Sequence, residues 1–114
     1  MINYEAFANV EMRIGEIKTV EIIEDADKLL KLTVDFGEVN EEGEPTVRQI
    51  VSGIRLYFED PQSLVGKKCP FVTNLEPRTI RGYESNGMIL AANSGDTFAL
   101  LIPSNDLPVG TRLA

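Results

Sequence analysis

Hydrophobic and polar residues alternate along much of the chain, which is the pattern of β-strands with one buried face. The alternation predicts a long first strand over residues 10–23 and a second strand over residues 30–36. Gly15 interrupts the first pattern, and a glycine inside a strand is typical of a bulge or a sharp bend. We therefore expect one long first strand that bends at Gly15.

The remaining predicted elements are short and separated by turn residues. The acidic segment 38–45 contains Gly and Pro and predicts a hairpin loop before a third strand at residues 47–51. A helical turn capped by Asp60 precedes a fourth strand at residues 68–75, in which Pro70 favours the sheet edge or the strand's start. The other expected elements are a short helix at residues 4–8 that lays Tyr4 and Phe7 on the core, a polar loop at 77–86, and strands at 87–92 and 97–102.

This succession of short strands without a long helix predicts an all-β fold, built as a small closed barrel. A long, bent first strand suits a five-stranded oligonucleotide/oligosaccharide-binding (OB-fold) barrel with short helical turns, because one strand must serve both halves of the sheet. An SH3-like barrel would give a similar pattern. A length of 114 residues corresponds to a single domain, residues 1–114.

The composition excludes several kinds of chemistry. The chain has no His and one cysteine, Cys69, so it cannot form a Ser-His or Cys-His couple, a His-ligated metal site or an intrachain disulfide. Gly66-Lys67 resembles the end of a phosphate-binding loop, but Pro61 and Lys68 stand where that motif needs Gly and Ser or Thr. We therefore expect a binding module without metal or cofactor rather than an enzyme.

The chain shows no secretory signal and no apolar stretch long enough to cross a bilayer, so we expect a cytoplasmic protein without membrane contact. The net charge of −7 argues against general nucleic-acid binding, but the charge is unevenly distributed. Residues 1–44 hold four basic and twelve acidic side chains, whereas residues 45–82 hold six basic and three acidic ones. This basic middle permits a local anion site, and we expect the acidic loop at residues 38–44 to lie away from it.

Four segments in a fixed order are more specific than any of these features. They are RIGEI (residues 13–17), ADKL (26–29), QIVSGI (49–54), and NLEP (74–77) leading into RGYESNGMILAA (81–92). The ordered set, from about Tyr4 to about Leu113, resembles the tRNA-binding domain found at the C-terminus of methionyl-tRNA synthetases. The same module occurs in free-standing tRNA-binding dimers, in multisynthetase cofactors and in CsaA-type export chaperones.

The resemblance implies a non-catalytic OB-fold barrel that pairs into a homodimer and binds tRNA by shape. It further implies that about residues 98–114 contribute to the dimer interface, and that a methionyl-tRNA synthetase catalytic subunit is a possible partner. Family members often carry His-Pro before ADKL, where this chain has Ile23-Glu24-Asp25. The alternative function is a CsaA-like export chaperone or a protein scaffold for a synthetase complex. It is the less favoured one, because CsaA-type chaperones generally lack the ADKL and VSG patterns that this chain has.

Cations, neutral hydrogen-bonding groups and soft apolar side chains are what a protein needs to bind the exposed corner of a folded RNA. Pattern alone favours Met88 as a core residue, whereas the resemblance places it and Ser85 near the RNA. For Arg48, the alternative is a surface ion pair with Asp35 or Glu44. The candidate tRNA-binding residues are Lys28, Arg48, Asn74, Arg78, Arg81, Ser85, Asn86 and Met88.

Overall fold

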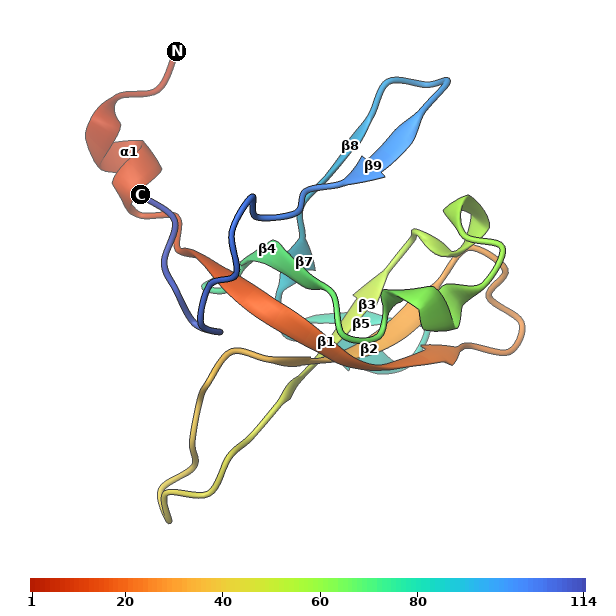
Figure 1. Ribbon diagram of the computed structural model, residues 1–114, viewed down its shortest axis with the longest axis horizontal. Coiled ribbons are helices and arrows are strands. Elements are labelled where there is room, and N and C mark those ends of the chain that lie inside the picture. The colour runs from red at the N-terminus through yellow and green to blue at the C-terminus, as the bar shows by residue number, and fades with distance from the viewer.

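The computed structural model describes residues 1–114, and its main feature is one antiparallel five-stranded sheet that curls into a nearly closed barrel (Figure 1). The strand order is β3-β2-β1-β4-β7. The barrel strands are β1 (Met12–Ile22), β2 (Leu30–Asp35), β3 (Arg48–Ser52), β4 (Lys68–Val72) and β7 (Met88–Ile89). The N-terminal half of β1 pairs with β4 and its C-terminal half pairs with β2, so one strand does serve both halves of the sheet. The all-β, OB-like architecture expected from the sequence is confirmed.

The irregularity in β1 lies between Ile17 and Thr19, where the register with β2 shifts, so the bulge that the sequence allowed at Gly15 is absent there. Gly15 pairs with β4 in regular register. A Cβ atom at this position would lie 2.5 Å from the ring of Phe36 and 2.6 Å from a methyl group of Val34. Glycine is therefore required here for close packing of the core and not for backbone conformation.

Alternation along the strands builds the core as predicted. The inward-facing Leu30, Leu32 and Val34 of β2 are fully buried, and the rings of Phe36 and Phe71 meet edge to face at 5.3 Å. The main cluster contains twelve buried residues: Ile17, Val20, Leu30, Leu32, Val34, Phe36, Ile50, Ile54, Leu64, Cys69, Phe71 and Ile89.

Pro70 lies in the third position of β4, between β1 and β7, so the strand is not at a sheet edge. The carbonyl of Pro70 accepts a hydrogen bond from Leu90 N at 3.1 Å. Because a strand residue directs its N and its C=O to the same side, the missing N–H faces the end of β7, which stops at Ile89. The short partner strand explains why proline is tolerated inside the sheet.

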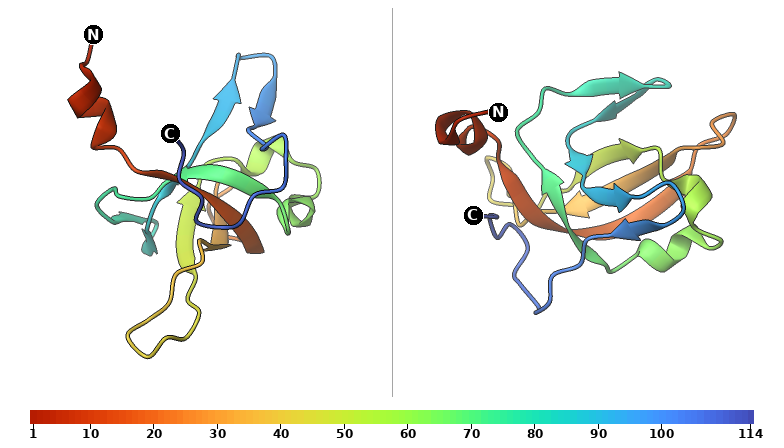
Figure 2. Two further views of the ribbon diagram at one scale, coloured as in Figure 1. Left: turned by 60° about the vertical axis from the view of Figure 1, so that its left-hand side comes forward. Right: turned by 90° about the horizontal axis from the view of Figure 1, so that it is seen from above.

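The predicted polar loop at residues 77–86 is instead a hairpin formed by β5 (Arg78–Ile80) and β6 (Tyr83–Ser85). Its two-residue turn, Arg81-Gly82, has positive φ at both positions, 53° and 84°. Those angles belong to a type I′ turn, which matches the twist of a hairpin. The strands predicted at 87–92 and 97–102 are shorter than expected: β7 ends at Ile89, and β8 (Ala91–Asn93) pairs with β9 (Phe98–Leu100) in a second hairpin that projects from the barrel (Figure 2).

The chain has three helical segments: α1 (Tyr4–Ala8) and the two 3₁₀ turns η1 (Arg55–Tyr57) and η2 (Pro61–Leu64). The predicted cap at Asp60 is confirmed, since its side chain accepts a hydrogen bond from Gln62 N at 3.1 Å. Helix α1 is present but stands outside the barrel (Figure 1), and Tyr4 and Phe7 are 80% and 42% exposed, so they do not lie on the core. No helix of this chain is both long and apolar enough to span a membrane.

Candidate nucleic-acid interface

The hairpin β5–β6 is fixed to the free edge of β3. Ser85 Oγ accepts a hydrogen bond from Val51 N at 3.0 Å, and Asn86 N donates to Gln49 O at 2.8 Å. Gln49 Nε2 in turn donates to Glu84 O at 3.0 Å. A small apolar cluster lies beneath the hairpin, made of Ile23, Ala26, Val51, Leu29 and Ile80. These contacts set the hairpin turn beside the loop at residues 25–29.

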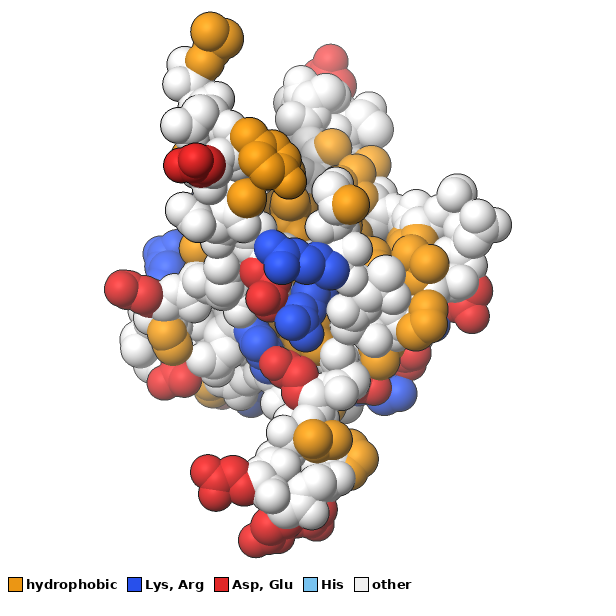
Figure 3. All heavy atoms as spheres, turned by 90° about the vertical axis from the view of Figure 1, so that its left-hand side faces the viewer, with side chains coloured by type: hydrophobic (Ala, Val, Ile, Leu, Met, Phe, Trp, Pro, Cys, Tyr) orange, Lys and Arg blue, Asp and Glu red, His pale blue; other side chains and the backbone are white.

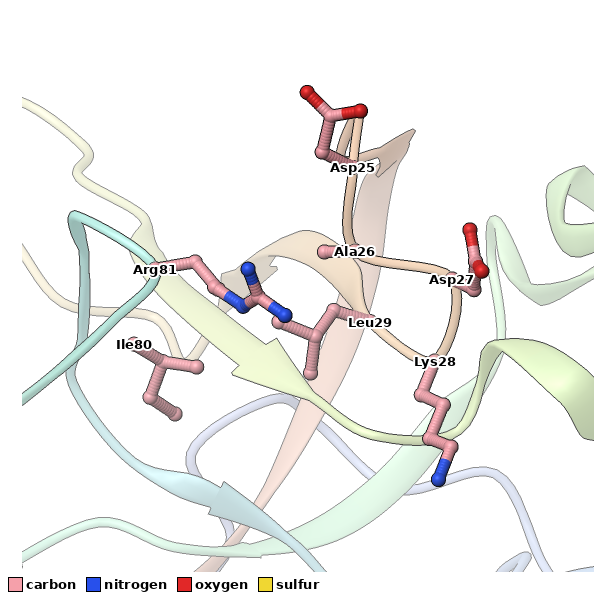
Figure 4. Close-up of a pocket in the computed structure, with 7 residues that line it drawn as sticks. All are labelled: Asp25, Ala26, Asp27, Lys28, Leu29, Ile80 and Arg81. Atoms are coloured by element: carbon pink, nitrogen blue, oxygen red, sulfur yellow. The ribbon is translucent and has the colours of Figure 1, made fainter.

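A hollow of about 550 Å³ lies between that loop and the hairpin (Figure 4). Arg81 extends from the hairpin turn toward Leu29, while Lys28 extends from the far end of the loop. Both side chains are exposed, and neither forms an ion pair or a hydrogen bond. Asp25 and Asp27 line the same hollow, so its formal charge is balanced. Its two cations are therefore available to bind an anion, although two carboxylates lie close by.

Two non-glycine residues with positive φ, Asp25 at 61° and Arg81 at 53°, both line this hollow. Left-handed backbone is uncommon for such residues and persists where the surrounding structure fixes it. At Arg81 the type I′ turn supplies that constraint. The backbone thus fixes where the Arg81 side chain starts, on the side of the hairpin that faces the loop.

A second, smaller and more enclosed hollow of about 80 Å³ shares Ile80 with the first. Arg78 and Met88 line it and are exposed, Met88 by 47%, so Met88 does not fill the core. Ser85 also lines it but is only 5% exposed, and its hydroxyl is already bonded to Val51. Lys28 and Arg81 thus line one hollow, and Arg78 and Met88 line the adjoining one, with Ile80 common to both. We call these four exposed residues the hairpin face, and Ser85 lies beneath Met88 and Arg78 in the second hollow.

Arg48, by contrast, uses four of its five N–H donors in bonds within the protein. Its Nε and Nη2 bind the carboxylate of Glu38 at 2.8 and 2.7 Å, and its Nη1 donates to Thr73 O at 2.6 Å and to Asn86 O at 3.4 Å. The alternative of an ion pair is therefore correct in kind, although the partner is Glu38. These charged hydrogen bonds lower the pKa of Glu38 and raise that of Arg48.

Asn74 is also engaged in holding the backbone. Its Oδ1 accepts from Glu11 N at 2.8 Å, and its Nδ2 donates to Asn9 O at 2.7 Å, which ties the segment before β1 to the end of β4. Asn86 contributes its backbone to the hairpin and its carbonyl to Arg48, with its side chain half-buried. Arg48, Asn74 and Asn86 therefore support the segment that carries the hairpin β5–β6.

On the face shown in Figure 3, Lys and Arg side chains gather among acidic ones in a mixed cluster that the sequence pattern did not predict. Arg13 and Arg112 are bridge partners, and Arg13 Nε lies 3.0 Å from Glu11 Oε1. A hydrogen bond from Thr73 Oγ1 at 2.7 Å, followed by the arginine charges, lowers the pKa of Glu11. No local sequence signal joins residues so far apart in the chain. Below the cluster, the acidic loop between β2 and β3 projects from the barrel (Figures 1 and 3).

The sequence profile of a family described as putative tRNA binding domain matches residues 12–112. The methionine–tRNA ligase of Deinococcus radiodurans is 44% identical over 114 residues, which are 99% of this chain and 16% of that protein, so the chain spans about one sixth of this curated relative. Among solved structures, a MetRS-related protein from Pyrococcus horikoshii is similar with a TM-score of 0.87 at 36% identity, covering 100% of this chain and 98% of the other. The chaperone CsaA from Bacillus anthracis is similar with a TM-score of 0.82 at 28% identity, covering 100% and 99%. The shared barrel, the ordered sequence segments and the match across nearly its whole length show that this chain belongs to the putative tRNA binding domain family.

Proposed function

We propose that this chain is a non-catalytic tRNA-binding domain, residues 1–114, that binds tRNA through the hairpin face. The observation that carries the proposal is that Lys28, Arg78 and Arg81 are exposed cations without ion pairs that line two adjoining hollows, the second of which also holds the exposed Met88. The chain is acidic overall, so a local group of unpaired cations is the part of its surface best suited to a polyanion. Family membership supports this reading.

The chemistry of the hairpin face favours recognition of shape over sequence. Arginine and lysine bind phosphate oxygens, which carry no base identity, and a methionine side chain contacts a base without selecting it. Binding should therefore differ little among tRNAs. Because each neutralised phosphate releases counterions, affinity should fall steeply with salt.

The biological role we propose is to raise the local concentration of tRNA near a synthetase in the cytoplasm. The chain would act in trans on a methionyl-tRNA synthetase catalytic subunit or as part of a longer synthetase, as its similarity to one segment of the Deinococcus enzyme supports.

We further propose that the protein acts as a homodimer. Exposed Leu101 and Ile102 line a largely apolar hollow of about 410 Å³ together with Ile14, Pro70 and Leu113. Exposed apolar patches of this kind often mark association surfaces. Residues 98–114 would then contribute to pairing. Sedimentation should show a dimer at micromolar concentration and a monomer for Ile102→Asp; a monomeric wild type would contradict this part.

A titration with several tRNAs at two salt concentrations tests the proposed function. We expect micromolar-range affinity for each tRNA and a weakening of all of them alike in Lys28→Gln and Arg81→Gln, with each variant lowering the salt slope by about 0.7–0.9. Lys67→Gln is the matched control, because Lys67 is exposed and unpaired but lines a different hollow. Absence of binding to any tRNA at low salt would refute the proposal.

The second candidate function is a CsaA-like chaperone or a protein-interaction scaffold for a synthetase complex. It is favoured by the similarity to the CsaA structure and by the apolar hollow at Leu101 and Ile102, which suits a peptide. Peptide binding that persists in the presence of excess tRNA, without tRNA binding itself, would support this candidate over the first.

A further inference from the structure

We infer that Arg48 is a positioning residue for the proposed tRNA interface, which it supports through its ion pair with Glu38, and that it does not contact tRNA phosphate. The inference rests on the proposed function. It assigns to the acidic loop a supporting role in nucleic-acid binding, although the charge of that loop would by itself repel RNA.

The first step is the arrangement of the Arg48 donors. A guanidinium has five N–H donors in a rigid fork, and here all three nitrogens have protein acceptors at 2.6 to 2.8 Å. The ring of Phe36 lies 5.3 Å from the guanidinium carbon. A phosphate at this position would have to displace or approach the Glu38 carboxylate, so the geometry disfavours direct contact.

The second step is that the hydrogen bonds of Arg48 connect the two ends of the segment that carries the hairpin. Arg48 begins β3, Glu38 lies at the base of the loop between β2 and β3, and Thr73 and Asn86 bracket the segment that carries the hairpin. Both ends of that segment are thus held by one guanidinium, whose orientation is fixed by one carboxylate. Hinge-like freedom at either end would move Arg78 and Arg81 relative to Lys28.

The third step is the tight fit of the segment beside Asn86. Gly87 has φ of 143°, and a Cβ there would lie 3.1 Å from both Ile50 Cδ1 and Val72 O. The segment therefore packs closely against Ile50 and Val72 at Gly87, and Arg48 binds it at the preceding residue, Asn86. Loss of the Glu38–Arg48 pair would release it at this closely packed point.

This arrangement predicts that loss of a negative charge in the acidic loop weakens tRNA binding, the opposite of what charge repulsion alone would give. Changing Glu38→Gln makes the protein less negative and leaves Arg48 without its anion. If Arg48 contacted phosphate, this change would free it and strengthen tRNA binding. If Arg48 positions the hairpin segment, the same change weakens tRNA binding despite the gain in net charge.

The experiment compares the Kd for one tRNA at several salt concentrations among wild type, Glu38→Gln, Arg48→Lys and the control Glu42→Gln. Glu42 belongs to the same loop and its side chain forms no ion pair, so its loss should leave affinity unchanged or slightly improved. We expect Glu38→Gln and Arg48→Lys each to weaken binding roughly three- to tenfold, less than a charged hydrogen bond itself contributes because the effect on tRNA is indirect, with an unchanged salt slope. Tighter binding in Glu38→Gln, or wild-type affinity in Arg48→Lys, would overturn the inference.

Amide hydrogen exchange gives a readout that does not depend on tRNA. In Glu38→Gln the Asn86 N–H, which is bonded to Gln49 O, should exchange faster than in wild type and in Glu42→Gln. Unchanged exchange at Asn86 would refute the positioning role. If wild type fails to bind tRNA at low salt while this exchange increases as expected, the proposed function fails and the support of the segment by Arg48 stands.

Discussion

The hydroxyl of Ser85 provides a sensitive test of how the hairpin is attached to the barrel. It accepts a hydrogen bond from Val51 N–H at 3.0 Å, and both residues are 5% exposed. Ser85→Ala would leave that N–H buried without a partner, which costs about 1–3 kcal/mol. With an unfolding entropy of about 2.1 cal/mol/K per residue, each kcal/mol lowers the Tm of a 114-residue chain by about 4 °C. The expected fall in Tm is therefore about 4–12 °C.

Thermal unfolding followed by circular dichroism measures this fall, with Ser63→Ala as the control because the Ser63 side chain is exposed and makes no hydrogen bond. We expect Ser63→Ala to change stability by less than about 0.5 kcal/mol. Exchange of the Val51 amide should also become faster in Ser85→Ala only. If the two variants have equal Tm values and Val51 exchanges as in wild type, then Ser85 does not anchor the hairpin and our reading of its burial is incorrect.

Three further predictions concern the core and the ion pairs. Gly15→Ala should destabilise the fold by about 1–3 kcal/mol in chemical denaturation, because the added Cβ would meet the side chains of two core residues. The control Gly53→Ala should be nearly neutral. A similar loss of unfolding free energy in both variants would argue against the close approach at Gly15. Arg48 lowers the pKa of Glu38, so the pair stabilises the protein above the ordinary glutamate pKa of about 4.3. This stabilisation is lost as the pH falls through the lowered pKa. The unfolding free energies of wild type and Glu38→Gln should therefore converge at low pH, and a constant difference between them would refute this. Burial raises the pKa of the Cys69 thiol to about 11, so alkylation at neutral pH should proceed only through unfolding, and fast labelling of the native protein would contradict the burial.

The barrel strands could be predicted from sequence because one face of each is buried. In β2 the order Leu-Lys-Leu-Thr-Val-Asp is reproduced residue by residue in the burial pattern. The hairpin β5–β6 could not be predicted in this way, since its strands have three residues each and its turn begins with Arg81, a residue type that rarely adopts positive φ. At Gly15 the sequence alone does not distinguish a glycine needed for a bulge or bend from one needed for close packing.

The candidate site was likewise predictable from sequence only in part. The resemblance identified Lys28 and Arg81, yet only the tertiary structure shows that they line one hollow. For Arg48 the sequence offered several acidic neighbours of equal standing, and the register of the loop between β2 and β3 selects Glu38. Which cations stay unpaired is therefore a property of the folded chain and not of its composition.

The last residues of the chain are hydrogen-bonded to the start of β1, and this has a practical consequence. Leu113 N donates to Met12 O, and Ile14 N donates to Thr111 O, both at 2.9 Å, so the two termini leave the barrel at neighbouring points, at the end away from loop 25–29 (Figure 1). A reporter, a purification tag or a fused enzyme could thus be joined at either terminus without covering the proposed tRNA-binding face. Removing the final five residues, by contrast, would delete the hydrogen bonds that Gly110, Thr111 and Leu113 make with the start of β1. Deletion mapping from that end would therefore measure lost stability together with any lost recognition.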